Sequence, residues 1–180
     1  KYLSKYKQIF RSYSIKNKKF QYVYIKPNVS KSGLYYSYSS KEINKIIKSN
    51  VDVLIRCGHG ILQGQILNCV KFGVLSYHHG DNNVFRGGPP GFWEVYFNHH
   101  KSGFIIQRLN EELDGGEVIF KGSIATAFNF SLNKARLILK SKVFMDLILK
   151  DISKGFIRQR IKNKPYSDII FTTPNLIQLL

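Results

Sequence analysis

Two short apolar runs, each followed closely by glycine and histidine, constrain the fold of this chain most. The first run, Asp52 to Cys57, is rich in β-branched residues and ends in Gly58-His59-Gly60. Such a continuous run predicts a strand buried on both faces of a sheet. The second run, Phe72 to Leu75, leads to His78-His79-Gly80. Ligands of open α/β sheets collect at the carboxyl ends of strands, so these two turns are the first places to look for a site.

Other periodicities predict further strands and helices around these runs. Alternation predicts strands at residues 19–25, 103–109 and 117–120. Ser39 with Glu42 has the form of a capping box, and Ile43, Ile46 and Ile47 would form one apolar face of the helix that follows. Further helices are predicted at 61–67, from Pro89-Pro90 to about His99-His100, and from a Ser131 cap to about Ile152. A loop is predicted at 27–33.

The order strand, helix, strand, helix, strand is typical of a parallel α/β sheet. The strands at 103–109 and 117–120 flank the acidic turn 111–116, so we expect them to pair antiparallel at one edge. The fold class predicted is therefore α/β, with a mostly parallel sheet flanked by helices and an antiparallel edge. We expect one domain over residues 1–153 and a C-terminal tail over 154–180.

Composition excludes several classes of protein. With 180 residues and 43% hydrophobic side chains, the chain is long and apolar enough for one real core. No run is long enough for a membrane helix, and no signal-peptide pattern opens the chain. Two cysteines, Cys57 and Cys69, are too few for a disulfide framework, which favours a reducing cytoplasm. The first residue is Lys1, so we expect a trimmed start.

The net charge of +17, with a pI of about 9.9, leaves two interpretations open. One is a polyanionic partner such as RNA, a nucleotide or an acidic cofactor. The other is compositional bias, because the lysines are scattered along the chain and are not gathered in one run.

His78 and Asp114 are the candidates for chemistry. A histidine titrates near neutral pH and can act as a general acid or base. A carboxylate beside it fixes its tautomer and raises its pKa. Each residue alone also has an ordinary interpretation, because histidines are common in loops and Asp-Gly is a common turn. Both follow strands of the same predicted sheet, so we predict that they meet in one cleft.

The sequence gives little support to a metal or phosphate site. The histidines are His59, His78, His79, His99 and His100. Adjacent histidines on a strand point to opposite faces, and neither His-Glu-x-x-His nor Cys-x-x-Cys occurs. The segment Gly87 to Gly91 is interpreted as the entry to a helix, and the aromatic residues from Phe92 onward as core.

In the order and spacing of these motifs the chain resembles the folate-dependent formyltransferases, which include methionyl-tRNA, glycinamide ribonucleotide and sugar N-formyltransferases. That family shows Asn-x-His at a strand end, a Ser-Leu-Leu-Pro loop, Arg-Gly, a Pro-led helix with Trp, and Leu-Asp-Thr-Gly. The matching residues here are Ser76-Tyr77-His78, Gly80 to Asn83, Arg86-Gly87, Pro90 with Trp93, and Leu113 to Gly116. His78 and Asp114 lie 114 − 78 = 36 residues apart, a separation similar to the family's. The resemblance covers about Val51 to Ile152.

The resemblance implies that residues 1–153 form a Rossmann-like catalytic domain of the formyltransferase type, which needs no metal. It would transfer a formyl group from 10-formyltetrahydrofolate, its co-substrate, to an amine. His78 would assist proton transfer and stabilise the oxyanion, and Asp114 would orient His78. Ser76 stands where the family has asparagine and would make a weaker oxyanion contact. Folate would be bound by Arg56, Cys57, Gly58, Ile61, Gly80, Leu113 and Asp114.

The resemblance leaves the acceptor and the outcome of the reaction open. The amine could belong to a nucleotide-linked amino sugar or to an aminoacyl-tRNA. One alternative is a degenerate formyltransferase-like domain that binds a nucleotide or RNA, which Ser76 and the positive charge favour. Another is a hydrolase that passes the formyl group from folate to water. No alternative involves a membrane.

Overall fold

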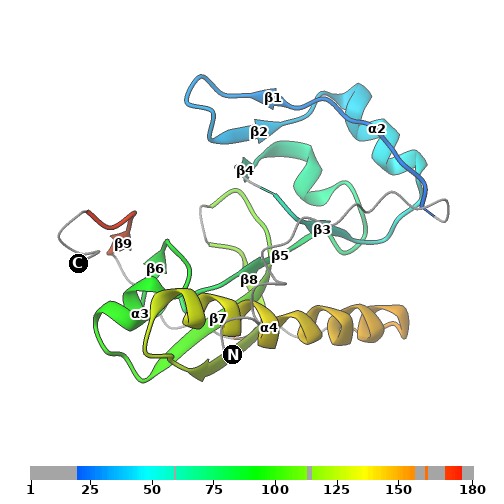
Figure 1. Ribbon diagram of the computed structural model, residues 1–180. Coiled ribbons are helices and arrows are strands. Elements are labelled where there is room, and N and C mark those ends of the chain that lie inside the picture. The colour runs from blue at the N-terminus through cyan, green and yellow to red at the C-terminus, as the bar shows by residue number, and fades with distance from the viewer. Residues whose placement is uncertain (1–19, 59, 113–114, 157–160, 162–168, 176–180) are drawn as a thin grey trace. The chain divides into compact units, whose positions relative to one another are not determined.

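The structure, a computed structural model, describes residues 20–58, 60–112, 115–156, 161 and 169–175 (Figure 1). The chain divides into two compact units. The described residues of 77–107 and 118–175 belong to the first unit, and those of 20–76 and 108–117 to the second. Strand β5 (Val74–His78) carries the chain from the second unit into the first.

The second unit combines two sets of paired strands with two helices. Its strands are β1 (Asn28–Val29), β2 (Tyr35–Ser37), β3 (Leu54–Arg56) and β4 (Ile61–Leu62). Its helices are α2 (Ser40–Lys48) and the 3-10 helix η2 (Gly64–Asn68). Strand β2 pairs antiparallel with β1 and parallel with β4. Strand β3 pairs parallel with β5, in a register that sets Arg56 beside Ser76.

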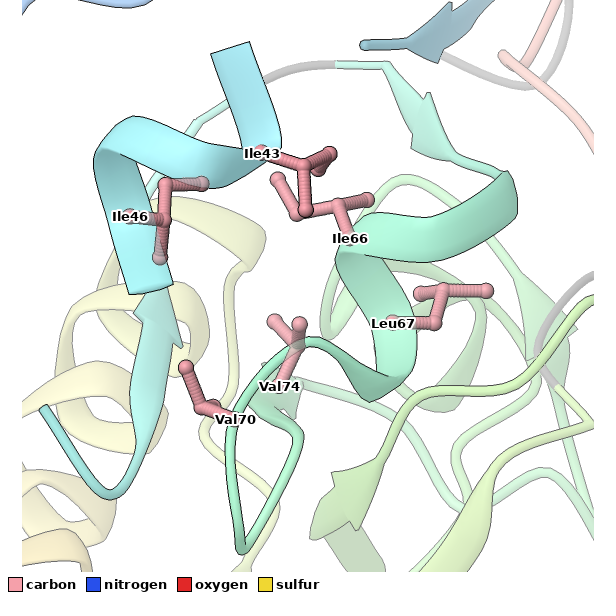
Figure 2. Close-up of a cluster of buried hydrophobic side chains, with 6 residues drawn as sticks. All are labelled: Ile43, Ile46, Ile66, Leu67, Val70 and Val74. Atoms are coloured by element: carbon pink, nitrogen blue, oxygen red, sulfur yellow. The ribbon is translucent and has the colours of Figure 1, made fainter. Parts of the chain in front are cut away.

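One cluster of aliphatic side chains forms the core of the second unit. Figure 2 shows its six buried members, which come from α2, η2, the connection after η2 and the start of β5: Ile43, Ile46, Ile66, Leu67, Val70 and Val74. Burial of each such side chain stabilises the fold by roughly 1.5–3 kcal/mol. This cluster therefore fixes the base from which β3 and β5 extend.

The first unit contains the remaining helices and strands. Its helices are α3 (Phe92–Tyr96) and α4 (Phe130–Ser153), and its strands are β6 (Arg86–Gly87), β7 (Lys101–Arg108), β8 (Glu117–Ala125) and β9 (Ile170–Phe171). The last residue of β7 and the first residue of β8 belong to the second unit. Strands β7 and β8 are neighbours. Thr126 N donates to His100 O at 3.1 Å, so the end of β8 lies beside the start of β7 and the two strands run in opposite directions.

Helix α4 packs against β7 and β8 (Figure 1), and aromatic side chains make the contact. The ring centroid of Phe144 lies 5.5 Å from that of Phe104 on β7 and 4.3 Å from that of Phe120 on β8. The apolar residues predicted for the long helix therefore form part of the core of the first unit, together with Ile106 and Leu137, which have no exposed surface.

The structure confirms the predicted fold class, a mixed α/β arrangement. Three strand pairs are parallel, β2 with β4, β3 with β5 and β6 with β9, and β1 pairs antiparallel with β2. The strand that ends at His78, the two strands around the acidic turn and the long helix all form where they were predicted.

The strand predicted at 19–25 is wrong for its described residues, 20–25. Side chains of α2 bind the backbone here, at Tyr24 within the segment and at Lys26 just after it. Lys45 Nζ donates to Tyr24 O at 3.2 Å, and Lys26 N donates to Glu42 Oε2 at 3.1 Å. Strand β1 forms farther along, within the predicted loop.

Two predicted helix starts are also corrected. Ser39 is the N-cap residue of α2, but its side chain makes no capping hydrogen bond, and Glu42, the other residue of the predicted capping box, pairs with Lys45 at 2.8 Å. Helix α4 is capped by Asn129, whose side chain accepts from Leu132 N at 2.8 Å, and not by Ser131.

Other boundaries differ from the sequence predictions. Residues 61–67 form β4 and the start of η2 and not one helix. Helix α3 starts at Phe92, after both prolines, and ends at Tyr96, before the histidines. Ile47 is 52% exposed, so it does not share the buried face of α2. Ile55 is 41% exposed, so β3 is not buried on both faces.

Candidate active site

The predicted site residues are divided between the two units. His78 and Gly80 lie in the first unit. The second unit contains the other described ones: Arg56, Cys57, Gly58, Ile61 and Ser76. Leu113, Asp114 and His59 lie outside the described residues. The structure thus places Gly80 against the ring of His78, and Arg56 beside Ser76. The pairing of His78 with Asp114 stays a prediction.

Strand β5 presents His78 on the face opposite to α4. Tyr77 faces α4, because its hydroxyl lies 3.0 Å from Lys142 O and accepts from Met145 N at 3.1 Å. Side chains alternate along a strand, so Ser76 and His78 point the other way. Ser76 is 2% exposed, whereas His78 is half-buried at the strand end. His78 is therefore the more accessible of these two predicted catalytic residues.

His79 has a structural role. Its ring stacks on that of Tyr77 at 5.4 Å, and its Nε2 lies 3.0 Å from Ser141 Oγ. The Ser141 hydroxyl donates to Ile138 O at 3.1 Å, so its oxygen accepts from His79, whose Nε2 carries the proton. Burial, followed by the positive neighbours His78 and Lys134, lowers the pKa of His79 to about 4.

The lowered pKa of His79 predicts acid sensitivity of the fold. Its pKa falls from 6.5 to about 4 on folding, so the unfolded chain binds the proton more readily. Stability should decrease as the pH falls from 6.5 toward 4 and then level off, with a loss of about 3 kcal/mol. Chemical denaturation across this pH range measures the effect. In His79→Gln, whose amide can still donate to Ser141, this part of the pH dependence should vanish.

The loop after His78 packs closely against the imidazole. A Cβ at Gly80 would lie 2.8 Å from His78 Nε2 and 3.3 Å from Phe85 O. Only a residue without a side chain fits there while the ring keeps its position. Gly80 therefore forms one wall of the space in which the His78 ring is held.

Gly80→Ala is expected to displace the His78 ring and to lower kcat/KM of the proposed reaction about tenfold or more, because misplacing a catalytic group by about 1 Å can cost a hundredfold. Gly88→Ala is the matched control, since a Cβ at Gly88 meets nothing within 4 Å. Kinetics of both variants, with thermal unfolding to confirm folding, check the prediction. Equal kinetics of the two variants would contradict it.

In the second unit the predicted folate-binding residues form a short connection between β3 and β4. The Arg56 guanidinium donates to Gly60 O across this connection. Gly60 has φ +82°, and the Tyr36 ring occupies the space a Cβ would need. Cys57 and Gly58 are exposed, and Ile61 N donates to Leu34 O at 2.7 Å. The backbone is thus fixed at both ends, with the Cys57 thiol open to a ligand.

A groove of about 320 Å³ in the second unit is lined mainly by apolar side chains and includes Arg56: Val23, Ile25, Ile46, Ser49, Val51, Leu54, Ile55, Arg56, Leu62, Ile66 and Val74. An apolar groove with a single cation suits a flat organic ring that carries an anionic group. Of the predicted folate-binding residues, only Arg56 contributes to it.

A pocket of about 340 Å³ in the first unit contains charged residues that the sequence did not single out. It is lined by Asp81, Val84, Phe85, Glu94, His99, Lys101, Gly103, Lys121, Gly122 and Ser123. Glu94 is only 3% exposed, and burial raises the pKa of its carboxyl. Its one signal in the sequence is a carboxylate among the aromatic residues of α3.

Among the described residues, no group of three or more histidines, cysteines, aspartates and glutamates could hold a metal ion. Within the same part of the chain, no helix is long and apolar enough to cross a membrane.

Comparison with known proteins gives a partial match in sequence. A methionyl-tRNA formyltransferase of Rickettsia felis is 32% identical over 84 residues, which are 46% of this chain and 28% of that protein. The match therefore spans little more than a quarter of the relative. No family model matches the chain.

Solved structures share the fold over a longer stretch. The formyltransferase PseJ of Anoxybacillus kamchatkensis, crystallised with UDP-4,6-dideoxy-4-formamido-L-AltNAc and tetrahydrofolate, has a TM-score of 0.55 at 23% identity, over 66% of this chain and 64% of its own. A methionyl-tRNA formyltransferase of Clostridium thermocellum has a TM-score of 0.53 at 17% identity, over 78% and 60%. At these identities the likeness shows the fold. The two comparisons agree: part of the chain is similar in sequence to methionyl-tRNA formyltransferase, and its fold is similar to that of solved formyltransferases.

Proposed function

We propose that this chain transfers a formyl group from 10-formyltetrahydrofolate to the amine of an acceptor. The observation that carries the proposal is the position of His78 at the carboxyl end of β5, on the face opposite to α4 and against the Gly80 loop. An imidazole held in this way can act on a reacting carbonyl. The family relationship supplies the chemistry.

In the proposed reaction the acceptor nitrogen attacks the formyl carbon, a new C–N bond forms, and the bond from that carbon to folate breaks. His78 donates a hydrogen bond to the formyl oxygen as negative charge develops on it. Asp114 orients His78 and favours its charged form. The proton that the acceptor amine loses is relayed through water by Asp114, with His78 assisting the transfer, and reaches the folate nitrogen that leaves. Ser76 contributes a second, weaker contact to the oxygen.

Folate would be bound by Arg56, Cys57, Gly58, Ile61, Gly80, Leu113 and Asp114. The exposed, fixed connection between β3 and β4 supports the first four of these assignments. The net charge of +17 supports an acceptor that carries phosphate, either a nucleotide-linked amino sugar or an aminoacyl-tRNA. Two cysteines outside disulfides are compatible with a place in the cytoplasm.

The test is an assay of the purified chain with 10-formyltetrahydrofolate labelled in the formyl group, and with amino sugar nucleotides and methionyl-tRNA as acceptors. Transfer of label to an amine supports the proposal. Release of labelled formate without any acceptor would overturn it in favour of a hydrolase. A steep decrease of acceptor binding with salt would indicate many phosphate contacts, as in tRNA.

A binding domain without catalysis is the second candidate, because Ser76 replaces the family asparagine and the chain is strongly basic. Absence of turnover with every acceptor, together with nucleotide or RNA binding that His78→Ala leaves unchanged, would select this function.

A further inference from the structure

The loop after His78 is polar where the formyltransferase motif is apolar. Asp81, Asn82 and Asn83 stand in place of Leu-Leu-Pro. Leucines and proline could hold such a loop by burial and by a fixed backbone angle. A polar loop needs hydrogen-bonding partners to hold one conformation.

Some of the hydrogen bonds that hold this loop in one conformation form within the loop itself. Asp81 Oδ1 accepts from Asn83 N at 3.1 Å, and Asp81 O accepts from Val84 N at 2.8 Å and from Phe85 N at 2.9 Å. These bonds close a compact turn directly after Gly80. They define the shape of the turn but do not attach it to the sheet.

The attachment comes from Lys121 on β8. Its Nζ lies 2.7 Å from Asp81 Oδ2 and donates to Asn83 Oδ1 at 3.2 Å. From β7, Gly103 allows close packing, because a Cβ there would lie 2.6 Å from Asp81 Cβ. One lysine therefore binds two side chains of the turn and holds it against β7.

We propose that Lys121 is a positioning residue that sets the place of the His78 imidazole through the Asp81–Asn83 turn. Asp81 follows Gly80 directly, and Gly80 is the residue packed against His78 Nε2. Loss of the lysine removes the attachment and leaves the Asp81 carboxylate without its cation, three residues from His78. The consequence for activity rests on the proposed formyl transfer, whereas the consequence for the imidazole does not.

The experiment compares Lys121→Met with Lys121→Arg, with the double variant Lys121→Met/Asp81→Asn, and with Lys140→Met as control. Lys140 is an exposed lysine of α4, in the same unit. Two quantities are measured: kcat and KM for formyl transfer, and the pKa of the His78 imidazole by NMR, with His78→Gln assigning the signal.

Lys121→Met is expected to lower kcat about tenfold with little change in KM for folate, because a displaced catalytic group slows the reaction more than it weakens binding. It should also raise the pKa of His78, because an uncompensated carboxylate favours the imidazolium. Lys121→Arg keeps the charge and should restore most of the rate. The double variant removes both charges and should return the pKa of His78 to the wild-type value.

Equal kinetics and equal His78 titration in Lys121→Met and Lys140→Met would overturn the inference. A loss of rate that follows only the fraction of folded protein, with the pKa of His78 unchanged, would also overturn it, since Lys121 would then be merely structural. Should the wild type transfer no formyl group, the proposed function fails, and the His78 titration still decides the role of Lys121.

Discussion

His78→Gln is expected to lower kcat/KM for formyl transfer about a thousandfold while the chain stays folded, within the range typical for loss of a general acid or base. Glutamine fills a similar volume and keeps a hydrogen-bond donor, but it cannot gain and lose a proton near neutral pH. The loss should therefore fall mainly on kcat, because His78 acts on the reacting carbonyl.

The matched control for His78→Gln is His100→Gln, which changes an exposed histidine of the same unit and should leave the rate unchanged. The pH dependence of kcat/KM gives a second measurement. A limb near the pKa of an imidazole should be present in the wild type and absent from His78→Gln. A variant that keeps a third of the wild-type rate would exclude His78 from proton transfer.

Asn133→Ala should cause the largest loss of stability. Asn133, on α4, has no exposed surface and joins three segments of the first unit. Its Nδ2 donates to Gly91 O at 2.8 Å and to Ser102 Oγ at 2.7 Å, and its Oδ1 accepts from Ala127 N at 3.0 Å. Alanine leaves these buried groups without their partner and opens a cavity, at an expected cost of about 3 kcal/mol.

Denaturant unfolding of Asn133→Ala against the wild type measures this cost. Ser131→Ala is the control, because Ser131 is exposed on the same helix and does not cap it. A change below 1 kcal/mol in Asn133→Ala would mean that water or a rearrangement satisfies Gly91 O and Ala127 N, contrary to the prediction.

Elements with a strong local pattern could be predicted from the sequence. The apolar run before His78 predicts a buried strand, the apolar stretch near 131–152 predicts a long packed helix, and both form close to their predicted limits. The position of His78 at a strand end followed from the same pattern. Local periodicity decides whether an element exists, because it determines which face can be buried.

The predictions that were wrong, or missing, concern segments whose structure depends on residues far away in the sequence. Residues 20–25 alternate as a strand would, but the side chains of Glu42 and Lys45 bind the backbone beside them. Asn129 caps α4 two residues before the predicted cap at Ser131, since several polar residues there could do so. Strand β9 is only two residues long, and no period reveals so short an element.

At the candidate site, too, contacts between residues close in the sequence could be predicted and contacts between distant residues could not. The Gly80 contact with His78 lies within three residues, where a sequence pattern can place both. Lys121 and Asp81 are 121 − 81 = 40 residues apart, and one lysine among many gives no sign of its partner. Glu94 resembled a core position because its neighbours are aromatic, and only its burial with a raised pKa distinguishes it.

The pairing of β6 with β9 has a consequence for synthesis on the ribosome. Arg86 and Gly87 find their strand partners at Ile170 and Phe171, and Phe171 O lies where a side chain on Gly87 would have to be. The partner is translated 170 − 86 = 84 residues later. The nascent chain can therefore bury much of the core described above before Arg86 and Gly87 acquire this strand partner.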